Sequence, residues 1–189
     1  MEQHKVSVIM RTKNRGMFLA RAIKSVISQT FKDWVMIIVN DGGDKEKVNQ
    51  VVDECGKGYE SKIKVIHNKE SVGPQNAANI GAKSSDSKYI VFHDDEDTWE
   101  PDFLKKSIGA LDNNTLPNIK GVMTHCATIV EEVEGGGIVN KGKQPLNSYV
   151  TNISLFHLAA RKLIIPISFV FERSVFDEVG YFDESLPVL

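Results

Sequence analysis

The chain has 189 residues, of which 41% are hydrophobic and 25% charged, a composition typical of a globular protein with a real core rather than a disordered or fibrous one. Its formal net charge of -2 provides no broad basic field, so we expect no nucleic-acid partner. Two cysteines without CxxC or Cys/His spacing argue against a disulfide framework and against structural zinc.

Four short apolar runs predict the strands of a sheet, at residues 6–10, 35–39, 63–66 and 89–92. Apolar residues at helical spacing follow the first run at 18–27 and the second at 48–55, and Pro74 opens an Ala-rich helix after the third. Apolar strands that alternate with helices indicate right-handed βαβ units. The first 115 residues therefore predict an α/β fold with a mostly parallel sheet covered on both faces.

The alternation loosens beyond Pro117. The pattern there predicts a strand at 121–127, a Gly-rich loop at 135–142, a helix near 153–161 and a strand near 167–171. No independent second domain is expected from this segment.

Targeting signals and membrane spans are not predicted. The N-terminus lacks the long apolar stretch of a signal peptide, and the most apolar window, residues 163–171, is about half the length needed to span a bilayer. We expect a cytoplasmic protein without a transmembrane segment, whose association with the inner face of the membrane would be peripheral.

Polar residues follow each of the four predicted strands, at 11–14, 40–41, 67–68 and 93–97. Ligands of open parallel sheets bind beyond the carboxyl ends of the strands, so these residues should line one binding edge. The nucleotide motifs GxGxxG after the first strand and GxxxxGK[ST] are missing, which argues against NAD-binding and P-loop proteins.

The acidic run Asp94-Asp95-Glu96-Asp97 is the sharpest feature of this edge. Four adjacent carboxylates repel one another unless a cation or solvent compensates, and Mg2+ or Mn2+ suits oxygen ligands completed by water and substrate phosphates. The alternative is a solvated acidic turn that leads into a helix after Pro101.

Other residues of this edge can also be interpreted either as structural residues or as parts of a binding site. Asp41 in Asn-Asp-Gly-Gly can be an ordinary turn residue, Thr12 can satisfy the backbone at a strand end, and Arg15 can be a solvated surface charge. Their joint position at one edge favours a binding site.

Six segments resemble the successive blocks of the family 2 glycosyltransferases: KVSVIMRTKNR, AIKSVISQTFKDW, IIVNDGG, NKESVGPQNAANIGAK, YIVFHDDEDTWEP and ISFVFERSVFDEVGYFDESL. The resemblance implies the Rossmann-like GT-A fold as a single domain over residues 1–189. Residues 1–115 would form the nucleotide-sugar-binding half, and 116–189 a partial acceptor-side half that is truncated at its C-terminus.

The resemblance also implies roles for individual residues. Thr12 and Asp41 would hold the nucleotide base, and a carboxylate can accept the ring N–H of uracil or thymine. Asp94 and Asp95 would contact the ribose, with Asp94 and Glu96 as the ligands of Mg2+ or Mn2+. The complete predicted nucleotide-sugar site comprises Thr12, Asn14, Arg15, Asp41, Asn79, Asp94 and Asp95.

Four positions depart from the family pattern: Arg11 replaces Pro, Asn40 the first Asp of the turn, Ala78 an Arg near the nucleotide, and Glu96 the metal-binding Asp. The change at Ala78 leaves Lys13 or Arg15 to contact the diphosphate.

The catalytic base is not assigned within the sequence. Relatives continue from the block that contains Asp183 and Glu184 into an acidic motif that supplies it, so we expect the base beyond Leu189 and a fragment of a longer protein. An inverting transfer needs such a carboxylate to take the proton of the acceptor hydroxyl.

The leading hypothesis is a metal-dependent inverting glycosyltransferase. It would move a sugar from a UDP-sugar or related donor to a saccharide, lipid-linked or surface-polymer acceptor, with the segment from Gly121 onward shaping the acceptor side and the loop 135–142 mobile over the donor. A non-catalytic nucleotide-sugar or metal-binding module and a sugar nucleotidyltransferase are the alternatives.

Overall fold

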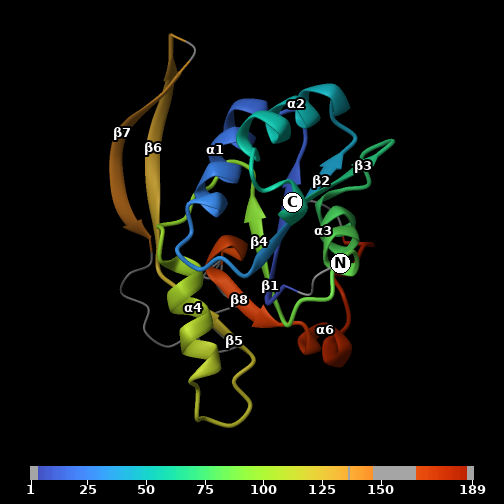
Figure 1. Ribbon diagram of the computed structural model, residues 1–189, viewed down its shortest axis with the longest axis vertical. Helices are drawn as coiled ribbons and strands as arrows, with labels where there is room; N and C mark the ends of the chain where they lie inside the picture. Colours follow the sequence, from blue (N-terminus) through green and yellow to red (C-terminus); the bar gives the residue numbers. More distant parts are fainter. Residues whose placement is uncertain (1–3, 136, 147–164, 187–189) are drawn as a thin grey trace.

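The computed structural model describes residues 4–135, 137–146 and 165–186. A six-stranded sheet with the order β3-β2-β1-β4-β8-β5 forms its centre (Figure 1). The strands are β1 (Val6–Thr12), β2 (Trp34–Asp41), β3 (Ile63–Asn68), β4 (Tyr89–Asp94), β5 (Gly121–Met123) and β8 (Phe169–Glu172).

The sheet is mostly parallel, which confirms the predicted α/β class. β1 pairs in parallel with β2 and β4, β2 pairs in parallel with β3, and β8 runs antiparallel between β4 and β5. The first four strands each extend two residues beyond the predicted carboxyl ends. Thr12, Asp41 and Asp94 are therefore the last residues of strands, whose positions the ladder holds.

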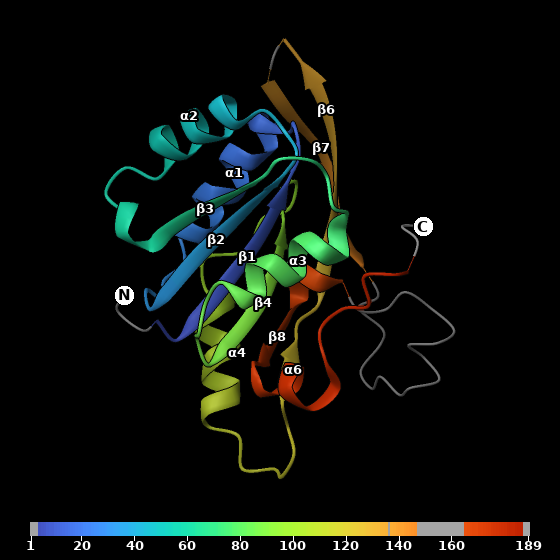
Figure 2. The same cartoon turned by 90° about the vertical axis from the view of Figure 1, so that its right-hand side faces the viewer.

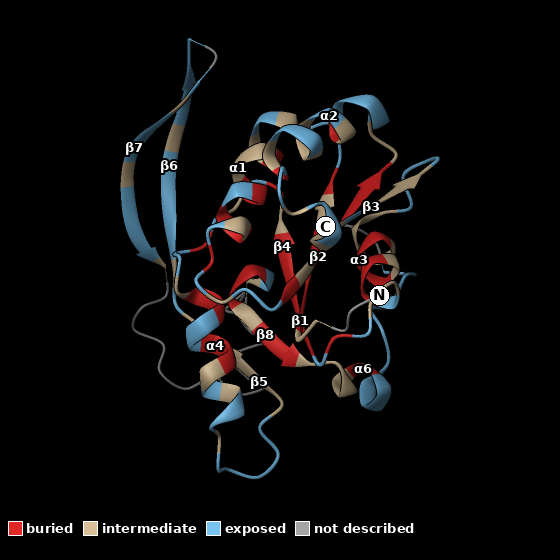
Figure 3. Ribbon diagram, in the orientation of Figure 1, coloured by how far each residue is buried: buried red, intermediate tan, exposed pale blue. Residues whose placement is uncertain are grey.

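Helices cover both faces of the sheet, and successive residues of the strands point to opposite faces (Figure 2). Val8 and Met10 pack into the core beneath α1 (Gly16–Ile27), α2 (Lys45–Cys55) and α4 (Phe103–Asp112), whereas Ile9 packs toward α3 (Pro74–Lys83) and α6 (Ser174–Val179). The burial pattern follows the same layers, with a buried sheet and exposed outer helix surfaces (Figure 3).

Small residues bring α3 close to the sheet. Ala77, Ala78 and Ala82 are buried against it, and a Cβ atom on Gly81 would lie 2.4 Å from Cγ2 of Ile9. The start of α3 is thereby held beside the carboxyl ends of β1 and β2.

The segment after α4 differs from the prediction. The predicted strand 121–127 is divided between β5 and β6 (Cys126–Glu134), and most of the predicted loop 135–142 belongs to β7 (Gly137–Leu146). A backbone ladder to β6 forms this strand despite its glycines, with a register shift at Val130/Glu131. We call the two strands the β6–β7 arm, which projects from the sheet (Figure 1).

Two further predictions concern the last part of the chain. The predicted strand 167–171 is β8, which begins two residues later because a 3-10 turn, Pro166–Ser168, precedes it. The predicted helix near 153–161 lies outside the described residues. Among the residues that are described, no helix is long and apolar enough to cross a membrane.

Candidate functional site

The carboxyl ends of β1, β2, β3 and β4 lie at one edge of the sheet, where the strand register brings the predicted site residues together. Thr12 is paired with Asn40, Arg11 with Asp94, and Asp41 with Asn68. The sheet topology therefore gathers polar residues that are up to 83 positions apart in the chain at a single edge.

Asp41 organises the loop between β3 and α3. Its Oδ1 accepts hydrogen bonds from Asn68 Nδ2 at 2.9 Å and Val72 N at 2.8 Å, and its Oδ2 accepts from Ser71 Oγ at 2.7 Å and Gly73 N at 3.1 Å. Burial alone would raise the pKa of Asp41, but these hydrogen bonds outweigh it and lower the pKa. A nucleobase would have to replace one of these donors to bind this carboxylate.

Asn40 explains one departure from the family pattern. Its amide donates to the carbonyl of Gly43 at 2.9 Å and accepts from the amide of Gly43 at 3.0 Å, and its nitrogen lies 3.1 Å from Nδ1 of His67. Nε2 of His67 faces Oδ1 of Asn49 at 2.9 Å. Because this network needs a side chain that both donates and accepts, Asn suits position 40 better than a carboxylate.

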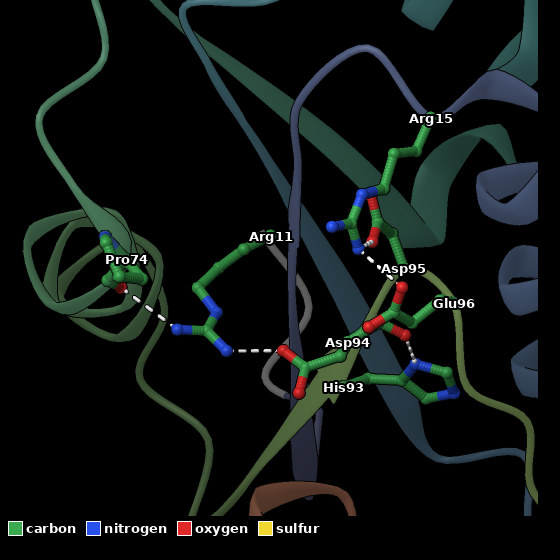
Figure 4. Close-up of polar contacts among 7 residues, drawn as sticks. All are labelled: Arg11, Arg15, Pro74, His93, Asp94, Asp95 and Glu96. Atoms are coloured by element: carbon green, nitrogen blue, oxygen red, sulfur yellow. Dashed lines mark hydrogen bonds and ion pairs between the residues drawn. The ribbon is translucent and has the colours of Figure 1, made fainter. Parts of the chain in front are cut away.

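The acidic turn follows β4 and is closed by a hydrogen bond from Asp97 N to Asp94 O at 3.1 Å. Two arginines neutralise it from opposite sides (Figure 4). Arg11 donates to Asp94, and Arg15 lies 3.4 Å from Oδ1 of Asp95 and 2.6 Å from Oε2 of Glu96.

Thr12 and Asp95 contribute two buried oxygen atoms without hydrogen-bond partners among the described residues, Oγ1 of Thr12 and Oδ2 of Asp95. Burial raises the pKa of Asp95, and the neighbouring Thr12 hydroxyl and the charge of Arg15 partly offset the rise. Unpaired buried oxygens are costly, so a cation or a ligand donor at this point would be stabilised.

Asp97 lies in a part of the turn where a negative charge is disfavoured. Burial, followed by the charges of Asp94 and Glu96, raises the pKa of Asp97 to about 6. Added positive charge beside the turn would relieve this repulsion.

His93 supports the turn from inside the core. Its Nδ1 donates to the backbone carbonyl of Asp94 at 2.8 Å, and its ring packs edge-on against Trp99 with centroids 4.4 Å apart. Burial lowers the pKa of His93 to about 4, so the imidazole is neutral at physiological pH.

Asn14 and Asn79 are engaged with the protein itself. Asn14 has a φ of 57°, and its Oδ1 accepts from Asp44 N at 2.9 Å at the start of α2. The amide of Asn79 donates to the carbonyl of Phe182 and to Oε1 of Glu184, both at 2.9 Å, and accepts from Phe182 N at 3.1 Å. Their predicted contacts with the nucleotide sugar stay predictions.

Metal ligation needs a rearrangement of these side chains. No group of three or more His, Cys, Asp or Glu residues within the described parts of the chain is arranged to hold a metal ion. Mg2+ commonly uses one or two protein carboxylates and completes its shell with water and phosphates, so Asp94 and Glu96 could hold it once the arginines move. The unpaired Oδ2 of Asp95 fits this need for a cation.

A groove of about 1010 Å³ lies between the acidic turn and the β6–β7 arm and is large enough for a saccharide. Its lining includes Asp97, Trp99 and Cys126. Arg21 also lines the groove and connects the β6–β7 arm to the acidic turn. Its side chain donates to Oε1 of Glu131 at 2.5 Å and to the carbonyl of Glu96 at 2.6 Å.

The sequence does not reveal the residues that surround the acidic turn, namely two arginines and a buried histidine. Arg11 was recognised only as a departure from the family, and Arg21 was not singled out, because nothing local shows that either side chain reaches the acidic turn. His93 belongs to the polar run 93–97, and its contacts with the Asp94 carbonyl and the Trp99 ring give it a structural role.

Comparison with known sequences identifies a family. The model described as Glycosyl transferase family 2 matches residues 7–177. An uncharacterized glycosyltransferase of Rickettsia prowazekii (strain Madrid E) is 30% identical over 182 residues, which cover 96% of this chain and 54% of the relative. An uncharacterized glycosyltransferase of Haemophilus influenzae is 30% identical over 127 residues, covering 67% of this chain and 38% of the relative.

Comparison with solved structures identifies the same fold. The mannosyltransferase PcManGT from Pyrobaculum calidifontis, in complex with GDP-Man and Mn2+, superposes with a TM-score of 0.68 at 14% identity, over 98% of this chain and 49% of that one. TarS residues 1–349 of S. aureus give a TM-score of 0.68 at 17% identity, over 97% of this chain and 52% of that one. The chain thus spans about half the length of these proteins.

Proposed function

Since the chain belongs to family 2 of the glycosyltransferases and has the GT-A fold, we propose that it is the donor-binding part of a metal-dependent inverting glycosyltransferase. The observation that carries the proposal is the pair of buried, unpaired oxygens of Thr12 and Asp95 beside the arginine-balanced acidic turn. A ligand that donates hydrogen bonds or carries positive charge would satisfy these oxygens.

The proposed donor is a nucleoside diphosphate sugar, with a UDP-sugar as the first candidate. The base would lie between Thr12 and Asp41, and the ribose and diphosphate would lie over Asp94, Asp95 and Arg15. GDP-Man in PcManGT and UDP-GlcNAc in TarS support the donor class but leave a choice between nucleotides.

We propose Mg2+ or Mn2+ as the cofactor, held by Asp94 and Glu96. The bound ion would supply electrostatic stabilisation of the leaving nucleoside diphosphate. The raised pKa of Asp97 agrees with this assignment, because burial and, after it, the charges of Asp94 and Glu96 disfavour a further negative charge at the turn.

The acceptor would approach through the groove beside Asp97, where polar and aromatic groups suit a saccharide, a lipid-linked sugar or a surface polymer. Asp183 and Glu184 are poor candidates for the general base. Asp183 accepts from Ser185, and Glu184 is bound by Asn79. The general base therefore stays unassigned among the described residues. We also propose a cytoplasmic location with at most peripheral contact at the inner membrane face.

Calorimetric titration tests the donor site. We expect UDP, GDP or dTDP to bind with Mn2+ or Mg2+ present and to lose at least about tenfold in affinity in Glu96→Ala. Glu100→Ala is the matched control, because Glu100 is an exposed carboxylate in the same region whose partner is Lys143. If no nucleotide binds, or if both variants lose affinity equally, the assignment is wrong.

Transfer assays separate the functional classes. Release of a nucleoside diphosphate from a nucleotide sugar supports the transferase, and pyrophosphate release would identify a nucleotidyltransferase instead. Binding without turnover in a protein of the length of these relatives would support a non-catalytic module.

A further inference from the structure

Arg11 joins the acidic turn to the start of α3. Its Nη2 donates to Oδ1 of Asp94, and its Nη1 donates to the carbonyl of Pro74 at 3.2 Å (Figure 4). The side chain is 24% exposed, and its Nε is buried without a partner among the described residues. A guanidinium with unused donors is therefore placed at the boundary between protein and solvent.

The strand register determines this position. Arg11 lies opposite Val39 on one side and Asp94 on the other. Arg11 and Ile9 point to the α3 face, because side chains alternate along β1. Arg15 approaches the same turn from the opposite side (Figure 4), so the two arginines have separate carboxylate partners.

Arg11 and a divalent ion would compete for Asp94. The ion pair already neutralises Oδ1 of Asp94, and a second cation within a few ångströms would repel the guanidinium. Metal binding without another ligand therefore costs the Arg11–Asp94 interaction. The displaced guanidinium needs a new anion, and its planar array of donors matches phosphate oxygens.

We propose that Arg11 is an exchangeable counter-cation that neutralises Asp94 in the empty site and binds the donor's diphosphate when the metal ion takes Asp94. This inference rests on the proposed function. It makes metal and nucleotide binding cooperative, because the diphosphate provides the partner that the metal takes away from Arg11. It also adds Arg11 to Lys13 and Arg15, the two residues that the sequence offers for the diphosphate contact.

Opposite changes in two affinities test the exchange. Mn2+ alone should bind Arg11→Met about fivefold more tightly than the wild type, because the guanidinium no longer occupies Asp94. The electron paramagnetic resonance signal of the free ion measures this affinity. The nucleoside diphosphate that binds the wild type most tightly should bind about tenfold more weakly at saturating Mn2+. Lys69→Met controls for long-range charge, since it removes a cation just beyond the end of β3 without touching Asp94, and it should change neither affinity by more than about twofold.

A second variant tests the same exchange from the other partner. Asp94→Asn releases Arg11 from its ion pair, so metal-free binding of the nucleoside diphosphate should strengthen by several-fold while the enhancement by Mn2+ disappears. This variant keeps the proposal testable if Arg11→Met does not fold.

The outcomes separate this proposal from the proposed function. Suppose that the wild type binds nucleotide with Mn2+, but that Arg11→Met changes both affinities in the same direction or leaves them unchanged. The proposed exchange of Arg11 is then wrong, whereas the proposed donor site is unaffected. If the wild type binds no nucleoside diphosphate under any condition, both proposals are overturned.

Discussion

Nε2 of His93 lies 3.3 Å from the hydroxyl of Ser25, so a buried polar contact joins the end of β4 to α1. The other ring nitrogen donates to the backbone carbonyl of Asp94. A neutral imidazole can satisfy both contacts, because one nitrogen donates and the other accepts. The first turn beyond β4 is thereby supported from within the core.

The protein should lose stability through His93 as the pH falls from about 6.5 toward 4. Burial lowers the folded pKa to about 4, so the unfolded chain binds a proton first. The contribution is fully present above pH 6.5 and is lost as the pH falls through 4, with a limit of about 3 kcal/mol. Urea unfolding at pH 7.5, 6 and 5 should show that His93→Gln improves relative to the wild type as the pH falls.

Asp97 should produce the opposite trend. Its folded pKa of about 6 lies above the ordinary value of 3.8, so protonation stabilises the folded state as the pH falls through 6. Asp97→Asn should therefore be most stabilising at pH 7.5, with an advantage that shrinks toward pH 5. Parallel stability curves for variant and wild type would show that the carboxylate is not strained by its neighbours.

Thr12→Val should separate ligand binding from folding. Because Oγ1 of Thr12 has no hydrogen-bond partner among the described residues, its loss should change the unfolding free energy by less than about 1 kcal/mol. Nucleotide affinity should fall about threefold to tenfold if the hydroxyl contacts the donor. Ser7→Ala is the matched control, since it removes another buried unpaired hydroxyl from β1, at the end away from the site. Equal nucleotide affinities in the two variants would exclude the Thr12 contact.

Asp41→Asn should destabilise the loop before α3 by about 2–4 kcal/mol, because an amide cannot accept all four hydrogen bonds. Hydrogen exchange should show faster exchange of the Val72 and Gly73 amides. Asp44→Asn is the same chemical change at the N-cap of α2, where Asn caps as well as Asp, so its effect should be within about 0.5 kcal/mol. Unchanged protection of the two amides would contradict the role of Asp41 in the loop.

Asn79→Ala should release the segment that follows α6. Three hydrogen bonds connect this amide to Phe182 and Glu184, so we expect a loss of about 2–3 kcal/mol in urea unfolding. The ring of Phe182, 5.2 Å from Phe92, should become more mobile in NMR spectra. Asn113→Ala, at the exposed end of α4, should cost less than about 1 kcal/mol. If the Asn79 variant lost nucleotide affinity while keeping full stability, the residue would bind the donor instead of the segment.

The sequence by itself determined the α/β class and the edge of the sheet at which polar residues gather. Apolar runs at 6–10, 35–39 and 89–92 predict buried parallel strands, since local periodicity reports which faces are covered, and the predicted site residues follow these runs directly. The sequence wrongly predicts a loop where β7 lies, because glycines such as Gly137 and Gly142 are typical of loops. Backbone pairing with β6 makes this segment a strand.

Only the tertiary structure decided which groups neutralise one another at that edge. Asp41 accepts hydrogen bonds from residues about 30 positions away, because β2 pairs in parallel with β3. Arg11 contacts a carboxylate 83 positions away, because β1 pairs in parallel with β4. Hydrogen bonds and ion pairs depend on distances of a few ångströms that strand register determines, and no local pattern of residues encodes those distances.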